Sequence, residues 1–275
     1  MPEATAKSEL RQFGYSAIAL AVVIAIAVGF AIPDLSRFAQ WGDGDAWLRD
    51  GVLSEPAWHA LKSAFCITTD GQFIPTALLS FLFDRMLFGT TAFFYHLHSL
   101  FGHITGSIVL MAFYRVLGMK LRWSFAMAAL WALLPPQLAN AFGIATRITV
   151  ARNLFSFLAL LIFAYAFHKP QRWRWALACG AAGLIAAGAS VQCLLLPILM
   201  FIAAFYQSNG TLKARFEQVL RQGAPALFLV VLAQLAIQYV TTLHAPAGLS
   251  CSLFHSFICG FLGIVLTRMT AHKTL

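Results

Sequence analysis

Long apolar segments recur along the chain, and they are the feature that most limits what it can fold into. The first covers residues 15–32 without a charged side chain, and Pro33 and Asp34 follow it. A helix needs about 20 mostly apolar residues to cross a bilayer. Because 60% of the 275 residues are hydrophobic and 11% are charged, a soluble domain of this size could not bury the apolar surface. The sequence therefore argues against a soluble enzyme, a nucleic-acid-binding protein and a disordered chain.

We predict an all-α, polytopic transmembrane helix bundle that forms a single integral membrane domain over residues 1–275. About eight expected spans cover residues 15–32, 93–117, 123–140, 149–167, 175–189, 191–206, 224–243 and 251–267. Residues 73–88 are apolar but too short to span, and they carry Asp84 and Arg85. We expect a short helix there that lies at the membrane interface or against the bundle.

The basic residues indicate the orientation of the bundle. With the N-terminus in the cytoplasm, 13 of the 19 Lys and Arg residues fall in cytoplasmic segments, as the positive-inside rule requires. This distribution accounts for the net charge of +9 without a nucleic-acid partner. We therefore expect a multi-pass protein with a cytoplasmic N-terminus, and the bacterial inner (plasma) membrane is its expected location.

The acidic residues are concentrated in one segment. Seven of the ten lie between the first and second expected spans, in an extracytoplasmic loop of roughly residues 34–92. No expected span carries an acidic residue near its centre, which argues against an ion-coupled transporter. The polar chemistry of the protein is therefore expected in this loop.

The loop contains a D-x-D pair, Asp43 and Asp45, in the sequence GDGD. Two carboxylates at this spacing could hold a divalent cation through hard oxygen ligands, or one of them could act as a general base for a hydroxyl. The same glycine- and aspartate-rich sequence is equally typical of a solvated turn. The residues alone leave both interpretations open.

Four short motifs occur in a fixed order from the last part of the loop to the end of the second expected span. They are Pro75, L-F-G at 87–89, Y-H-L at 95–97 and R-V-L-G at 115–118, and L-P-P at 134–136 and R-N-L at 152–154 follow. Their order and spacing resemble the GT-C superfamily of polytopic glycosyltransferases, most closely the branch related to tetratricopeptide-bearing O-mannosyltransferases. The resemblance covers about residues 10–205.

The resemblance implies a membrane glycosyltransferase. Such enzymes transfer a sugar from a polyprenyl-phosphate donor in the membrane lipid to a protein or glycan acceptor on the extracytoplasmic face. An aspartate of the first outer loop acts as catalytic base or as a metal-linked carboxylate. In this chain that role falls on Asp43 or Asp45, with a divalent cation such as Mg or Mn as the implied cofactor.

Four further residues are candidates for substrate binding. Charge develops on the leaving lipid phosphate, and Arg147 and Arg152 stand at the outer end of an expected span, where they could support it. Interfacial snorkelling is the alternative role for these arginines. We expect His96 near the entrance of the site, in a hydrogen bond to loop or substrate, and Asp70 is a weaker carboxylate candidate.

The chain also departs from the family pattern at several usually polar positions, which are Ile74, His98, Pro135, Asn153, Val191 and Gln192. Charged groups that could bind a lipid phosphate or tune a carboxylate are lost at some of them. A catalytically inactive or truncated GT-C-like membrane scaffold is therefore the alternative function.

Overall fold

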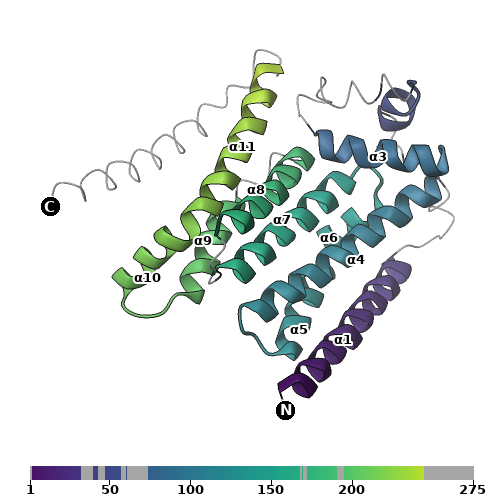
Figure 1. Ribbon diagram of the computed structural model, residues 1–275. Helices are drawn as coiled ribbons and strands as arrows, with labels where there is room; N and C mark the ends of the chain where they lie inside the picture. The colour runs from purple at the N-terminus through teal and green to yellow at the C-terminus, as the bar shows by residue number, and fades with distance from the viewer. Residues whose placement is uncertain are drawn as a thin grey trace.

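The computed structural model of the protein describes residues 2–31, 40–42, 47–56, 60, 74–167, 169, 172–190 and 195–244 (Figure 1). The expected span at 251–267 and the carboxylates Asp43, Asp45 and Asp70 lie outside these residues. The helices are α1 (Pro2–Ala31), η3 (Trp47–Val52), α3 (Pro75–Phe88), α4 (Ala92–Val116), α5 (Leu121–Ala132), α6 (Pro135–Phe142), α7 (Arg147–Ala166), α8 (Arg172–Ala189), α9 (Leu196–Gln207), α10 (Leu212–Gln218), η5 (Val219–Gly223) and α11 (Ala224–His244).

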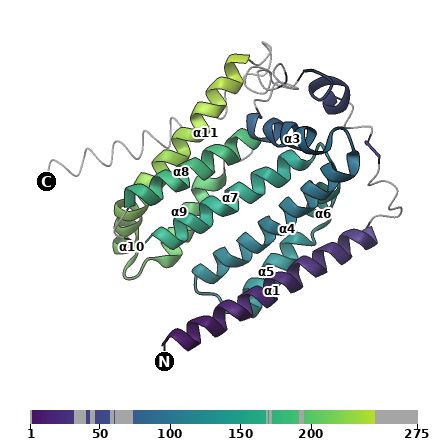
Figure 2. The same cartoon turned by 45° about the vertical axis from the view of Figure 1, so that its right-hand side comes forward.

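The long helices lie side by side, and α3 lies across one end of them (Figures 1 and 2). Neighbouring pairs in this layer are α1 with α4, α4 with α7, α7 with α8, and α8 with α11. Helices α5 and α6 pack against α4 and α1, and α9 packs against α7 and α11. We call the end that α3 covers the α3 end. The opposite end, where residues 117–120 join α4 to α5, is called the turn end.

Four helical segments are long and apolar enough to cross a membrane, and the pair α5–α6 makes five if the two count as one span. The four are Ser8–Phe30, Ala92–Val116, Arg147–Ala166 and Leu212–Tyr239. The helices expected at 93–117 and 149–167 are confirmed as α4 and α7, with ends that differ by at most two residues. The part of the chain that the structure describes therefore forms a helical bundle of the membrane type.

The segment 123–140 differs from the single continuous span that we expected. It forms α5 and α6, whose axes are bent by 67° at a short break. Pro135 and Pro136 follow the break, and Leu134 before them has the extended backbone (φ −58°, ψ 134°) that a residue preceding proline prefers. The two prolines therefore end α5 and start α6 in a new direction.

Helix α1 shows how the bundle divides its surface between protein and lipid. Leu20, Ile24 and Val28 repeat every four residues and are buried against α4 and α5. Ile18, Val22, Ile26 and Phe30 repeat in the same way on another face and are at least 50% exposed. An apolar stripe of this length outside the protein core suits contact with acyl chains.

The close contact of α4 and α7 depends on small residues. A Cβ added at Gly102 would stand 2.9 Å from Val150 Cγ1, and one added at Gly106 would stand 3.6 Å from the Leu154 Cα. Small residues at such positions let helix backbones approach without a hydrophobic driving force between them. Gly102 therefore holds the register in which the two helices, and the polar residues at their α3 ends, face each other.

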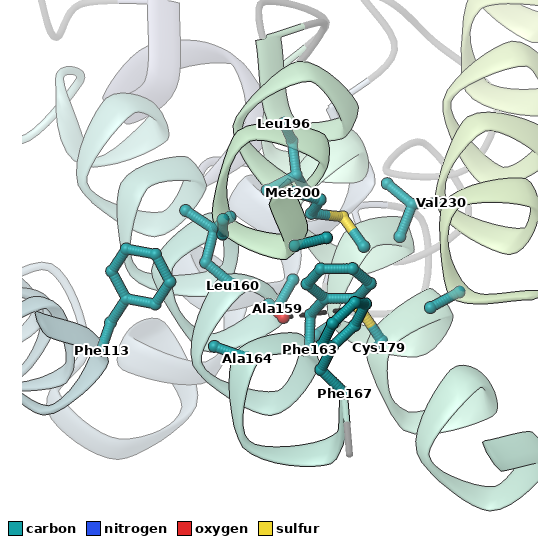
Figure 3. Packing of buried hydrophobic residues seen from close by; sticks show 14 of the residues in the cluster. Phe113, Ala159, Leu160, Phe163, Ala164, Phe167, Cys179, Leu196, Met200 and Val230 are labelled. Atoms are coloured by element: carbon teal, nitrogen blue, oxygen red, sulfur yellow. Dashed lines mark hydrogen bonds between the residues drawn. The ribbon is translucent and has the colours of Figure 1, made fainter. Parts of the chain in front are cut away.

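The main apolar core lies away from α3, between α7, α8, α9 and α11 (Figure 3). Phe163, Met200 and Val230 meet there from three helices, and Figure 3 shows their side chains converging. The Cys179 thiol is buried and donates to the Ala159 carbonyl at 3.4 Å. This part of the bundle is mainly apolar, whereas buried charged side chains occur at the α3 end.

Candidate functional site

A buried group of polar side chains joins three helices at the α3 end. Asp84 comes from α3, His98 from α4, and Arg147 is the first residue of α7. Arg147 Nη1 donates to Asp84 Oδ2 at 2.5 Å, and His98 Nδ1 donates to Asp84 Oδ1 at 2.6 Å. The Asp84 side chain is 1% exposed, so both oxygens of a fully buried carboxylate are engaged. We call these three residues the Asp84 cluster.

Arg147 is held on every side by protein. Its Nε donates to Ser99 Oγ at 3.2 Å and its Nη2 donates to the Tyr95 carbonyl. The guanidinium also lies over the ring of Phe81, with Cζ 4.6 Å from the ring centroid. A buried charge is tolerated only when it is paired and its donors are used. The guanidinium therefore contributes to fixing α3 on α4 and α7, and direct contact with a substrate phosphate would require the ion pair to open.

His98 is the member of the cluster that reaches the surface. Its side chain is 40% exposed, whereas that of Asp84 is 1% exposed. Because Nδ1 faces the carboxylate, Nδ1 carries a proton. Nε2 is then the ring nitrogen that could exchange a proton with a group outside the cluster. An imidazole oriented by a buried carboxylate is an arrangement that can accept or donate a proton.

The sequence prediction did not select Asp84 or His98 as site residues. It places Asp84 on a short helix at the membrane interface or against the bundle, and it treats His98 as a departure from the family pattern. The signal that could have found Asp84 is its position in an otherwise apolar helix, since an acidic residue there requires a partner. Nothing local in the sequence names that partner, because Arg147 follows 63 residues later.

His96 ties the first loop to the bundle. Nδ1 contacts the Phe142 carbonyl at the end of α6, and Nε2 contacts the Gln40 carbonyl at 3.2 Å. His96 as a whole residue is 9% exposed. We expected His96 near the site entrance in a hydrogen bond to loop or substrate, and one of its two ring nitrogens does contact the loop backbone, at Gln40. It therefore positions the segment that leads into the D-x-D pair.

Trp41 continues this attachment. Its indole Nε1 donates to the Thr90 carbonyl at 3.0 Å, and its ring centroid lies 5.0 Å from that of Tyr95. Tyr95 is fully buried, and its carbonyl is the one that accepts from Arg147. Residues 40–42 therefore lie one side chain away from the Asp84 cluster.

A second part of the loop rests on α3. Arg85 Nη1 donates to the Glu55 carbonyl, which links the segment after η3 to the α3 helix. Within η3, the exposed Arg49 donates to both oxygens of Asp50 at 2.7 and 2.8 Å. The hydrogen bonds from Arg49, together with its positive charge, lower the pKa of the Asp50 carboxyl below its ordinary value.

Arg152 lies apart from Arg147 on the same helix. Five residues along an α-helix turn the direction of a side chain by about 140°, so the two arginines leave α7 on different faces. Arg152 Nε and Nη2 are each 3.4 Å from Asn153 Oδ1, and Asn153 Nδ2 donates to Gln137 Oε1 of α6 at 3.2 Å. The two cations that we expected to act together are therefore separated, and Arg152 is the partly exposed one.

The carboxylates expected to act as base and metal ligands, Asp43 and Asp45, and the weaker candidate Asp70 lie outside the described residues. Among the residues that the structure describes, no group of three or more His, Cys, Asp or Glu side chains could hold a metal ion. Asp84 offers no ligand, since Arg147 and His98 occupy both of its oxygens. A divalent cation therefore remains an expectation attached to Asp43 and Asp45, and no step below depends on it.

Comparison of the chain with protein-family models, with curated proteins and with solved structures gave no match in any of the three. The function is therefore argued from the site and from the motifs in the sequence.

Proposed function

We propose that the protein is an integral membrane glycosyltransferase of the GT-C kind. It transfers a sugar from a polyprenyl-phosphate donor to a protein or glycan acceptor at the α3 end of the bundle. The observation that supports this most is the attachment of residues 40–42 beside the Asp84 cluster through His96 and Trp41. Asp43 follows Gly42 directly in the sequence.

The proposed mechanism uses one base and one phosphate contact. Asp43 or Asp45 takes the proton of the acceptor hydroxyl as that oxygen attacks the anomeric carbon, and the bond to the lipid phosphate breaks on the opposite side. Arg152 neutralises the charge that develops on the leaving phosphate. The Asp84 cluster and His96 act as positioning residues that hold the loop and α3 over α4 and α7. Asp70 is the weaker candidate for the base.

The donor explains why such a site belongs at the end of a bundle. Its polyprenyl tail has to remain among acyl chains while its phosphate and sugar reach water, so the reacting bond lies at the membrane surface. The α3 end offers polar groups at the ends of α4 and α7, both of which are long enough to span. The same geometry fits the long first loop and short interfacial helix of the GT-C pattern.

The full architecture that we propose has about eight spans, with the N-terminus in the cytoplasm of a bacterial cell and the α3 end outside the inner membrane. The directions of successive helices are consistent with spans that alternate across the membrane. Helix α1 ends towards the α3 end, α4 starts there, and α7 starts there again (Figure 1). Arg115, Lys120 and Arg122 then lie at the turn end, on the side where the positive-inside rule places basic residues.

We expect a topology reporter fused after Arg174 or Arg215 to be active in the cytoplasm, and one inserted next to Asp50 to be active outside. The reason is the 13-to-6 division of Lys and Arg between the two sides. Paired alkaline phosphatase and fluorescent-protein fusions measure both sides. A cytoplasmic signal at Asp50 would contradict the proposed orientation, because the site would then lie on the cytoplasmic face.

We expect Arg152→Ala to weaken donor binding, which a raised KM for the lipid-linked sugar would report with a smaller change in kcat. Arg152→Lys should restore part of the affinity, because a point charge still meets a phosphate although bidentate geometry is lost. Transfer is measured with the purified protein and a radiolabelled polyprenyl-phosphate sugar. Arg122→Ala, an exposed arginine at the turn end, is the matched control. Equal kinetics for the Arg152 and Arg122 variants would contradict the assignment.

A non-catalytic membrane scaffold descended from the same fold is the second candidate. The observation that favours it is that Arg147 is engaged by Asp84, Ser99 and Tyr95, so a cation that could have met a phosphate is used for structure. Under this alternative no variant in the loop changes a transfer rate, and the assay separates the two functions.

A further inference from the structure

A cavity of about 260 Å³ opens at the turn end, between α1 and the connection from α4 to α5. Its lining residues are Glu9, Gln12, Phe13, Arg115, Lys120 and Leu121. The volume is below the roughly 300–1,000 Å³ typical of pockets for whole drug-sized ligands, so it suits a small group better than a complete substrate. The cavity is at the opposite end of the bundle from the Asp84 cluster, and nothing in the proposed transfer reaction uses it.

The fold orients one of the two cations of this cavity and places the other beside it. Arg115 Nη1 donates to the Met119 carbonyl at 2.7 Å, which orients the guanidinium over the connection. Gly118 makes the reversal with φ +90°, a backbone conformation that L side chains rarely adopt. Lys120 then stands as the N-cap of α5 without a side-chain cap hydrogen bond. An arginine, a lysine and the start of a 12-residue helix therefore border the same space.

The charges around the cavity favour an anion. Glu9 is the acidic residue in the lining, and its Oε2 is 4.0 Å from Arg115 Nη2, too far for a hydrogen bond. Arg11 and Arg122, next in the chain to two lining segments, are exposed cations. The guanidinium is therefore only partly compensated by the carboxylate, and the first turn of α5 adds positive potential.

The cavity also has an apolar wall and lies at a membrane boundary. Phe13 and Leu121 line it. The apolar part of α1 that could span a bilayer starts at Ser8, within one residue of Glu9. Leu10, Tyr15 and Ile18 on the same helix are at least 64% exposed, as expected where acyl chains cover it. We therefore expect the opening to lie at the depth of lipid headgroups, with acyl chains beside it.

We propose that this cavity binds the phosphate of an anionic phospholipid from the leaflet at the turn end. Arg115 and Lys120 hold the phosphate oxygens, and Phe13 and Leu121 contact the glycerol and upper acyl chain. Basic pockets between spanning helices on the cytoplasmic side are suited to anionic headgroups. A bound lipid of this kind would join α1 to the α4–α5 connection, two elements that meet at the cavity.

The test uses the full-length protein, purified in detergent, stripped of lipid and titrated with phosphatidylglycerol or phosphatidylcholine, with native mass spectrometry to count bound lipids. We expect one phosphatidylglycerol bound in preference to phosphatidylcholine. Lys120→Gln should weaken this binding about fivefold, since one surface cation is worth about that much towards an anionic lipid. Arg115→Gln should weaken it by about tenfold or more because a charge-assisted hydrogen bond is also lost.

Lys213→Gln is the matched control, because Lys213 is an exposed lysine of α10 outside the cavity. Lys120 is exposed in a connection, so Lys120→Gln keeps the test valid if Arg115→Gln fails to fold. Equal binding of the two lipids, or equal losses in the Lys120 and Lys213 variants, would overturn the proposal. Competition by millimolar glycerol 3-phosphate as strong as by the lipid would assign the cavity to soluble phosphates and overturn the lipid as its ligand.

Discussion

Asp84→Ala is expected to lower the free energy of unfolding by about 3–5 kcal/mol, the range measured when one partner of a buried ion pair is removed. The reason is that Arg147, 3% exposed in its side chain, would keep its charge without a carboxylate. The α3 helix would lose its polar attachment to α4 and α7 at the same time. Thermal unfolding of the purified protein in a mild detergent measures the effect as a lower melting temperature.

A double replacement serves as the control for this result. Asp84→Leu combined with Arg147→Met removes both charges and keeps comparable volume, and such exchanges are often neutral or stabilising. We therefore expect the double variant to melt close to the wild type, well above Asp84→Ala. His98→Gln, at the 40% exposed edge of the cluster, should have a smaller effect than Asp84→Ala. A wild-type melting temperature for Asp84→Ala would mean that the ion pair does not hold α3.

The double variant Asp43→Asn, Asp45→Asn is expected to reduce sugar transfer by about 10²–10⁴-fold, the usual contribution of a general base. The amide keeps the size of each side chain but cannot accept the proton of the acceptor. Expression and melting temperature should stay unchanged, because the pair stands in a glycine-containing loop sequence where side chains carry little folding energy. The radiolabelled transfer assay measures the rate.

Asp50→Asn is the matched control for the loop. Asp50 is an exposed carboxylate of the same loop and is paired with its neighbour Arg49. Transfer that survives loss of both Asp43 and Asp45 would remove them from the mechanism. Asp70, or the His98–Asp84 pair that reaches the surface, would then be the next candidate base. No measurable transfer by the wild type would favour the scaffold.

The spanning helices were the part of the fold that could be predicted best. Helices α4 and α7 begin and end within two residues of the expected bounds, because an uninterrupted apolar run has to cross the bilayer whatever its neighbours are. The bend between α5 and α6 was missed although Pro135 and Pro136 stand at it. That prediction followed the hydropathy of the segment. The helix nevertheless breaks there, because proline cannot continue a helix in its interior.

The polar contacts were less accessible from the sequence. Placing Asp84 and Arg147 on the same side of the membrane was within reach of charge and hydropathy, and that prediction included both. Their direct contact depends on how α3 crosses α4 and α7, and on the close approach that Gly102 permits. Such a contact joins residues far apart in the chain, and no local periodicity encodes it.

The outer face of helix α3 is apolar and exposed. Phe83, Met86 and Leu87 on that face are 57–78% exposed, while Ala77 and Phe81 are buried against the bundle. Large apolar side chains at the end of a bundle favour immersion in the upper acyl region over contact with water. We therefore expect α3 to lie at the membrane interface, at a level that follows the thickness of the bilayer. A thinner or thicker membrane is then expected to strain the Asp84–Arg147 attachment, which would make the stability of this protein depend on lipid composition.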